Sequence, residues 1–319
     1  MTSQPAWQSK RTLLIGGVAA VVVLILGIGG FFLLSGEPAP SPTPSPSEAS
    51  SPTPIPTEEA LNRQLLNNRL TVLFVGLDSN EARRSRGETL NTDALLLLSI
   101  SARQSELTLV SLPRDTVDLP RPDGTVWPRK INALYAAEGI EALTDTLAET
   151  YQVEVHGHLV LDMDDFAAIV DAVDGITVDP PQPLSDPPIG LNLAAGEQEI
   201  DGLTTLAYVR TRIDQDYGRM GRQQEVIQQI AAELADPDTD VDLPELLGGL
   251  DSLETDLPLD ELRTFVEIAR RAQDAEVTEI LIQPPLITFE GDAGDGRGYI
   301  LVPDVDAIRA RVAEAMGSD

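Results

Sequence analysis

An unbroken apolar stretch near the N-terminus constrains this chain more than any other feature. Residues 13–34, LLIGGVAAVVVLILGIGGFFLL, contain only apolar side chains and glycine. A helix of this length crosses a hydrocarbon core of roughly 30 Å. A secretory signal has a shorter apolar region followed by a small-residue cleavage site, so the pattern favours a retained anchor. We predict one transmembrane helix over residues 12–35.

The charges that flank this stretch predict its orientation. Lys10 and Arg11 precede it, whereas Glu37 and no basic residue follow it closely. Basic flanks remain on the cytoplasmic side of a membrane. We therefore expect residues 1–11 to form a cytoplasmic stub of a single-pass cell-membrane protein, with the remainder of the chain extracytoplasmic.

The segment after the apolar stretch is rich in Pro, Ser and Thr. Residues 37–57 read EPAPSPTPSPSEASSPTPIPT, a composition that favours extended polyproline II structure and cannot form a core. We interpret residues 36–57 as a linker that holds the remaining chain away from the membrane. No repeat and no second linker follow, so residues 58–319 are predicted to form one domain.

Charge and composition exclude several classes of function. The chain has 52 acidic and 22 basic residues, a net charge of −30. Such a field repels nucleic acid, so we expect no nucleic-acid partner. The absence of cysteine excludes disulfides and a cysteine nucleophile.

The outer domain alternates short apolar runs with amphipathic segments. Runs of strand length, apolar on both faces, are typical of a sheet covered on both sides. We predict an α/β fold in which a mixed central sheet is covered by helices in three α-β-α layers. The expected strands are 71–77, 94–100, 107–112, 158–163 and 278–283, and a long loop is expected at 180–200 and a glycine-rich turn at 291–298. The expected helices are 58–70, 131–151, 164–175, 202–210, one from about 218, 258–274 and 304–316.

Common catalytic motifs are missing. The sequence has no phosphate-binding Gly-x-x-x-x-Gly-Lys loop, no Gly-x-Ser-x-Gly elbow and no His-Glu-x-x-His helix. His156 and His158 alternate along one strand, a spacing that more often reflects structure than zinc binding. The remaining chemistry must use carboxylates and arginines.

Two aspartates are candidate metal ligands. Asp78 follows an apolar strand and Asp93 precedes the next one, so both are expected at one edge of the sheet. Paired carboxylates suit Mg²⁺, or alternatively Mn²⁺, which completes its shell with water and phosphate oxygens. From the pattern alone, turn capping explains each aspartate about equally well.

Basic residues in this acidic chain are candidate anion ligands. Arg114 ends a predicted strand, and Lys130 stands at the start of a helix, where a bound anion would offset its unfavourable interaction with the helix dipole. The segment 207–224 contains Arg210, Arg212, Arg219, Arg222 and Gln223. Arg219, Arg222 and Gln223 share one face near a helix N-terminus, which favours phosphate. The alternative is a solvated helix face with local ion pairs.

Several of these stretches resemble the LytR-CpsA-Psr family in order and spacing. They are Phe-Val-Gly-Leu-Asp-Ser (74–79), Thr-Asp (92–93), Val-Ser-Leu-Pro-Arg-Asp (110–115), Lys-Ile-Asn-Ala-Leu-Tyr (130–135), Ala-Tyr-Val-Arg-Thr-Arg (207–212) and Gly-Arg-Met-Gly-Arg-Gln-Gln (218–224). The resemblance implies an Mg²⁺-dependent phosphotransferase that moves a glycopolymer from a polyprenyl-pyrophosphate carrier to peptidoglycan and releases polyprenyl phosphate.

The resemblance also implies roles for individual residues. Asp78 and Asp93 would hold Mg²⁺ and, with Arg114 and Arg210, form the catalytic set. The residues implied to bind pyrophosphate are Arg114, Lys130, Arg210, Arg212, Arg219, Arg222 and Gln223.

The sequence departs from the family pattern at two positions. Asn80 and Asn91 stand where the family often has arginine, and arginines of the intervening loop, at 83, 84 and 86, are candidates to replace a lost phosphate contact. Two other functions stay open: a non-enzymatic module that binds wall polymer or regulates its attachment, and a polyprenyl-pyrophosphate hydrolase that uses water as acceptor.

Overall fold

The computed structural model describes residues 61–235, 246, 249–258 and 261–317. No helix within these ranges is long and apolar enough to span a membrane. The predicted stub, the predicted transmembrane helix and the predicted linker lie outside the described residues. Those three predictions therefore remain predictions.

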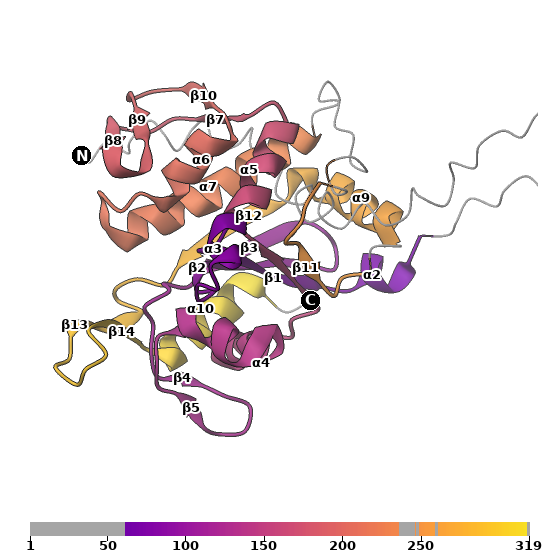
Figure 1. The fold of residues 1–319 in the computed structure, drawn as a ribbon. Coiled ribbons are helices and arrows are strands. Elements are labelled where there is room, and N and C mark those ends of the chain that lie inside the picture. The colour runs from indigo at the N-terminus through magenta and orange to yellow at the C-terminus, as the bar shows by residue number, and fades with distance from the viewer. Residues whose placement is uncertain (1–60, 236–245, 247–248, 259–260, 318–319) are drawn as a thin grey trace, which may run out of the picture.

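A six-stranded mixed sheet forms the centre of the fold (Figure 1). Its strand order is β11-β6-β1-β2-β3-β12. β1 pairs antiparallel with β2 and parallel with β6, and β3 pairs antiparallel with β2 and parallel with β12. The bounds are β1 Leu70–Leu77, β2 Thr92–Ile100, β3 Glu106–Ser111, β6 Gly157–Leu161, β11 Glu254–Thr255 and β12 Glu276–Leu281.

Helices cover both faces of this sheet (Figure 1). One face packs against α5 (Met163–Ala172), α6 (Gly202–Arg210), α7 (Gln215–Ala235) and α9 (Leu262–Arg271). The other packs against α4 (Leu134–Tyr151) and α10 (Val305–Met316). The predicted mixed sheet covered by helices is confirmed.

Strand β1 illustrates why the sheet is apolar on both faces. Successive side chains of a strand point to opposite faces. Val72 and Phe74 accordingly belong to the core beneath α5–α7, whereas Leu73 and Val75 belong to the core beneath α4 and α10. Burying each such side chain stabilises the fold by about 1.5–3 kcal/mol.

Short aspartate caps fix the beginnings of three helices. Asp162 accepts hydrogen bonds from the backbone amides of Asp164 and Asp165, at 3.0 and 3.1 Å. Asp201 caps α6 and Asp304 caps α10 in the same way. Such caps satisfy orphan amide groups and contribute about 1 kcal/mol each.

The smaller elements include several that the sequence analysis did not predict. The stretch 180–200 is not a plain loop, because it contains β8 (Leu184–Asp186), the 3-10 turn η5 (Pro187–Ile189), β9 (Leu191–Leu193) and β10 (Gln198–Ile200). The helix predicted at 131–151 begins as the 3-10 turn η4, and its α-helical part is interrupted at Gly139, whose φ is 85°. The bounds of the smaller elements are α2 Arg63–Asn67, α3 Glu81–Ser85, β4 Leu119–Pro120, β5 Val126–Trp127, η4 Ile131–Ala133, β7 Ile176–Val178, β8 Leu184–Asp186, η5 Pro187–Ile189, β9 Leu191–Leu193, β10 Gln198–Ile200, η7 Ala272–Asp274, β13 Ile287–Asp292 and β14 Tyr299–Pro303.

Candidate active site

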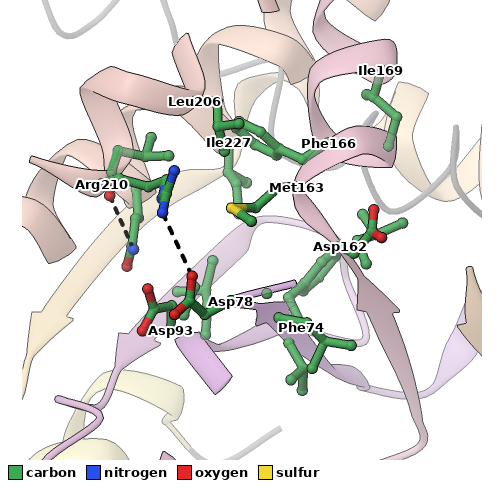
Figure 2. Close-up of a pocket in the computed structure, with 18 of the residues that line it drawn as sticks. Phe74, Asp78, Asp93, Asp162, Met163, Phe166, Ile169, Leu206, Arg210 and Ile227 are labelled. Atoms are coloured by element: carbon green, nitrogen blue, oxygen red, sulfur yellow. Dashed lines mark hydrogen bonds and ion pairs between the residues drawn. The ribbon is translucent and has the colours of Figure 1, made fainter. Parts of the chain in front are cut away.

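A deep cavity lies between the sheet and helices α5, α6 and α7 (Figure 2). It holds about 1010 Å³ of empty space, including the part that opens to solvent. Its walls are mostly apolar, and the apolar lining includes Phe74, Leu96, Leu159, Leu161, Met163, Phe166, Ile169, Leu206, Val209, Ile227 and Ile230. The charged or amide side chains in its lining are Asp78, Asp93, Asp162, Arg210, Arg219 and Gln223.

Asp78 follows the last residue of β1 and lines the cavity. Its backbone amide donates to the carbonyl of Asn91 at 2.8 Å, which ties it to the residues just before β2. Its Oδ1 lies 2.6 Å from Nη1 of Arg83 and 3.6 Å from Nη2 of Arg210. The Asp78–Arg210 pair is drawn in Figure 2. Asp78 thus stands between two guanidinium groups.

Asp93 approaches the same cavity from the neighbouring strand. β1 and β2 are antiparallel, and their register shifts after Gly76: Gly76 lies opposite Ala94 but Leu77 lies opposite Thr92, so Asp93 is the residue that the register skips. Nη1 of Arg114 donates a hydrogen bond to Oδ1 of Asp93. Burial opposes the positive charge of Arg114, but Asp93, Asp115 and Asp216 outweigh it and raise the pKa of Arg114. Arg114 therefore remains a cation next to the cavity.

Arg219 is a nearly buried cation in the cavity wall. Only 1% of the residue is exposed, and its Nε has no hydrogen-bond partner. Burial lowers the pKa of this guanidinium, and the attraction of Asp216, whose Oδ2 lies 3.5 Å from Nη2, only partly offsets the effect. An arginine held in this way would gain strongly from an anion that supplies the missing acceptor.

The other predicted anion ligands occupy different surroundings. Nζ of Lys130 lies 3.0 Å from Oδ1 of Asp115, and neither residue lines the cavity. The exposed Arg212 places Nε 3.5 Å from Oδ1 of Asp216. Gln223 does line the cavity, with Nε2 3.4 Å from the carbonyl oxygen of Val209.

Arg222 is held by the protein itself. Its guanidinium donates to the carbonyl of Tyr208 at 2.8 Å and to that of Thr211 at 2.6 Å, and it pairs with Asp214. These contacts join the start of α7 to the end of α6. Arg222 therefore fixes the position of the segment between Arg210 and Arg219.

Some site residues were not singled out by the sequence analysis. Asp162 lines the cavity with a fully buried side chain, caps α5 and accepts a hydrogen bond from Arg84. The capping pattern before α5 predicts the helix start but not the contact with a residue 78 positions away. Arg83 and Arg84 both belong to α3, so this short helix is paired with two carboxylates of the cavity.

The two aspartates have the chemistry that a magnesium site requires. Asp78 and Asp93 offer carboxylate oxygens to one cavity, and Mg²⁺ typically takes one or two carboxylates, with phosphate and water completing its shell. No group of three or more His, Asp or Glu residues suited to a metal occurs in the described ranges. The donor set therefore fits an ion that shares its coordination with a substrate phosphate.

The two histidines make structural contacts. His156 Nδ1 accepts a hydrogen bond from the amide of Thr71 at 3.1 Å. His158 Nδ1 lies 3.1 Å from Oδ1 of Asp256. These contacts attach β6 and the residues before it to the neighbouring segments.

Comparison with known proteins identifies a family and several relatives. The model of the LytR_cpsA_psr family matches residues 45–305. The polyisoprenyl-teichoic acid–peptidoglycan teichoic acid transferase TagU of Oceanobacillus iheyensis is 27% identical over 308 residues, covering 92% of this chain and 90% of that protein. TagU of Bacillus subtilis is 29% identical over 227 residues, covering 70% of each protein.

Solved structures share the fold. Bacillus subtilis TagV aligns with a TM-score of 0.62 at 21% identity, covering 78% of this chain and 98% of that one. A structure described as TagT bound to LIIa-WTA aligns with a TM-score of 0.62 at 20% identity, covering 82% and 95%.

Proposed function

Because the chain belongs to the LytR-CpsA-Psr family, we propose that it attaches a glycopolymer to the bacterial cell wall. In this proposal the donor is a polyprenyl-pyrophosphate-linked glycopolymer and the acceptor is peptidoglycan. The products are the wall-linked polymer and polyprenyl phosphate. Relatives named as teichoic acid–peptidoglycan transferases, one of them matching nine-tenths of the chain, support this reaction class.

The observation that carries the proposal is the combination of two environments in one cavity. Apolar side chains from the sheet and from α5–α7 line most of it, whereas Asp78, Asp93, Arg210 and Arg219 provide charge. Apolar walls bind a hydrocarbon chain and exclude water, while arginines bind phosphate oxygens in forked geometry. A lipid with a pyrophosphate head would place its hydrocarbon chain against the apolar walls and its phosphates beside the charged side chains.

Asp78 and Asp93 would hold Mg²⁺, or alternatively Mn²⁺, and the bound ion would neutralise negative charge on the pyrophosphate. The arginines of the chain would supply the remaining positive charge. Arg210 and Arg219 line the cavity, and Arg114 stands beside it on Asp93. Their positive charge would stabilise the charge that develops as the lipid phosphate departs and the acceptor hydroxyl forms its bond to phosphorus.

The buried Arg219 is especially suited to this role. Its Nε lacks an acceptor, so a phosphate oxygen would relieve an existing deficit instead of displacing a protein partner. Gln223 is a further amide donor in the cavity lining. Lys130 and Arg212 would contribute charge at longer range, and Arg222 would hold the segment between Arg210 and Arg219 in place.

We also propose that residues 12–35 cross the cell membrane with residues 1–11 in the cytoplasm. The linker 36–57 would then present the domain on the extracytoplasmic side. Both the lipid-linked donor and the wall acceptor would be accessible there. The apolar stretch and the basic residues before it support this topology.

The test is Mg²⁺-dependent cleavage of a polyprenyl-pyrophosphate sugar by the full chain in detergent micelles. We expect Asp93→Ala and Arg210→Ala each to lower turnover about a hundredfold or more, because Arg210→Ala removes a positive charge from the site and Asp93→Ala removes a proposed ligand of the metal ion that would supply another. Arg270→Gln is the matched control, since Arg270 is exposed on α9, away from the cavity lining, and pairs with Glu267.

The dependence of product formation on a glycan acceptor distinguishes a transferase from a hydrolase. A transferase gives a sugar-phosphate adduct in the presence of a glycan acceptor, whereas a hydrolase gives the same free phosphate product with or without it. No turnover by a folded wild-type protein, with retained polymer binding, would support the non-enzymatic module instead.

A further inference from the structure

A β-hairpin beside the candidate active site carries exposed aromatic side chains. β13 and β14 form this two-stranded unit, which extends from the body of the domain (Figure 1). Tyr299 is 50% exposed on this hairpin. Tyr217, near the N-terminus of α7, is partly exposed and contacts the same hairpin.

One carboxylate holds the two tyrosines in place. The hydroxyl of Tyr217 donates to Oε2 of Glu290 at 2.8 Å, and the hydroxyl of Tyr299 donates to Oε1 of the same residue. Among the described residues, no Lys, Arg or His forms an ion pair with Glu290. We name Tyr217, Glu290 and Tyr299 the tyrosine shelf.

The tyrosine shelf is attached to both segments that carry cations of the candidate site. On one side, Asp216 precedes Tyr217 and lies 3.5 Å from Arg219 of the cavity wall. On the other side, the amide of Leu301 in β14 donates to the carbonyl of Asp115 at 3.1 Å, next to Arg114. These contacts place the shelf outside the cavity lining, next to the segments that carry Arg114 and Arg219.

We propose that the tyrosine shelf binds the saccharide of the acceptor glycan. This inference rests on the proposed transfer reaction, which requires a sugar hydroxyl to reach the phosphoryl group from outside the cavity. A tyrosine ring presents a flat apolar face to the C–H face of a sugar ring, and its polar edge tolerates water. The carboxylate between the rings accepts hydrogen bonds from sugar hydroxyls.

Charge favours the acceptor over the donor polymer as the occupant. The shelf contains Glu290, and Asp292 lies two residues further along β13, opposite Tyr299. Such a cluster repels a polyanionic chain but not an uncharged sugar. An uncharged glycan is therefore the occupant that the charge of the shelf favours.

The hydroxyls of Tyr217 and Tyr299 remain hydrogen-bond donors at neutral pH. The hydrogen bond to Glu290 and partial burial raise the pKa of Tyr299 to about 12. Burial and the same carboxylate raise the pKa of Tyr217. Both hydroxyls stay protonated and keep the rings anchored.

The test measures transfer to a soluble, uncross-linked glycan strand by the full chain, with acceptor and donor varied separately. We expect Tyr217→Ala and Tyr299→Ala each to raise the acceptor KM about tenfold and to leave the donor KM and the turnover at saturating acceptor unchanged. The Phe variants keep the ring and should show a smaller rise. Binding of a β-1,4-linked N-acetylglucosamine tetramer, followed by NMR, should weaken in parallel.

Phe289→Ala is the matched control. Phe289 is 42% exposed on the same hairpin, but it neighbours Glu290 in β13 and so points to the opposite face. An unchanged acceptor KM in both tyrosine variants, or an equal rise in Phe289→Ala, would overturn the proposal. If the wild type does not cleave the donor at all, the proposed reaction is contradicted. The titration with the tetramer would then still show whether the tyrosine shelf binds a saccharide.

Discussion

Arg83 and Asp78 form an ion pair at the candidate active site, with Nη1 of Arg83 lying 2.6 Å from Oδ1 of Asp78. Arg83 is also bound to Glu88 at 2.7 Å, and Arg84 of the same helix pairs with Asp162. Helix α3 thereby brings cations to two carboxylates of the cavity. In particular, Arg83 forms an ion pair with the carboxylate of Asp78, which is proposed to bind Mg²⁺.

Removing this cation should strengthen metal binding. We expect Arg83→Gln to lower the Mg²⁺ concentration that half-saturates donor cleavage about fivefold, because one unit charge near 4 Å costs about 1 kcal/mol in a water-like medium. Arg86→Gln is the control, since Arg86 is exposed and pairs with Glu88 instead of Asp78. A higher Mg²⁺ requirement in Arg83→Gln would show that Arg83 supports the metal site and does not compete with it.

The apolar cavity predicts a dependence on lipid length. Leu206 of α6 lines the cavity, and Leu206→Trp should fill part of it. We expect about tenfold weaker binding of a long polyprenyl pyrophosphate and a smaller effect on a short one, measured by competition with a fluorescent lipid. Leu203→Trp on the same helix is the control, because Leu203 is 71% exposed. Equal losses for long and short lipids would argue against a chain in this cavity.

We expect substitution of Arg222 to lower the stability of the folded protein and not to act through a lost contact with the substrate. Lysine cannot reach the Tyr208 and Thr211 carbonyls and the Asp214 carboxylate together, so Arg222→Lys should lower the free energy of unfolding by about 2 kcal/mol. Urea unfolding measures this change. Arg212→Lys, at an exposed position, should change stability by less than about 0.5 kcal/mol. An Arg222→Lys protein of normal stability but weak substrate affinity would instead support direct phosphate binding.

Glu225 predicts how stability varies with pH. Burial raises the pKa of its carboxyl, although the hydroxyl of Tyr208 donates to it at 2.8 Å and Arg222 lies near it. A carboxyl whose pKa is higher in the folded state favours folding while it is protonated, and this contribution is lost as pH rises through the folded pKa.

Glutamine should keep the hydrogen bond and remove the buried charge. We therefore expect Glu225→Gln to be more stable than wild type at pH 8, and this gain to shrink as the pH falls through the raised pKa of Glu225, as measured by urea unfolding across that range. Glu279→Gln, on β12, is the comparison for a more exposed carboxylate. A gain that does not depend on pH would rule out the carboxyl as its source.

Local sequence pattern predicted most of the central architecture. The apolar runs at 94–100 and 107–112 became β2 and β3, and the amphipathic stretches at 202–210 and 304–316 became α6 and α10 within two residues. The glycine-rich turn at 291–298 joins β13 to β14. These features depend on backbone conformation and on side-chain period, both of which are set by neighbours in the chain.

The candidate site was predictable in composition but not in arrangement. Asp78 and Asp93 line one cavity, as their positions at strand ends suggested, and Arg210 and Arg219 line it as well. The spacing of Arg219 and Arg222 gave them the same predicted role. In the structure Arg219 lines the cavity with an unpartnered Nε, whereas Arg222 is bound to α6 carbonyls.

Sequence by itself determined the elements and the residues available for chemistry, because helix and strand periodicity are local. Tertiary structure decided which of those residues meet. It closed α5–α7 over the sheet to form the cavity, paired Arg84 with Asp162 and fixed Tyr217 on Glu290. Each of these contacts joins distant parts of the chain, so it depends on how whole elements pack and not on the local pattern of either partner.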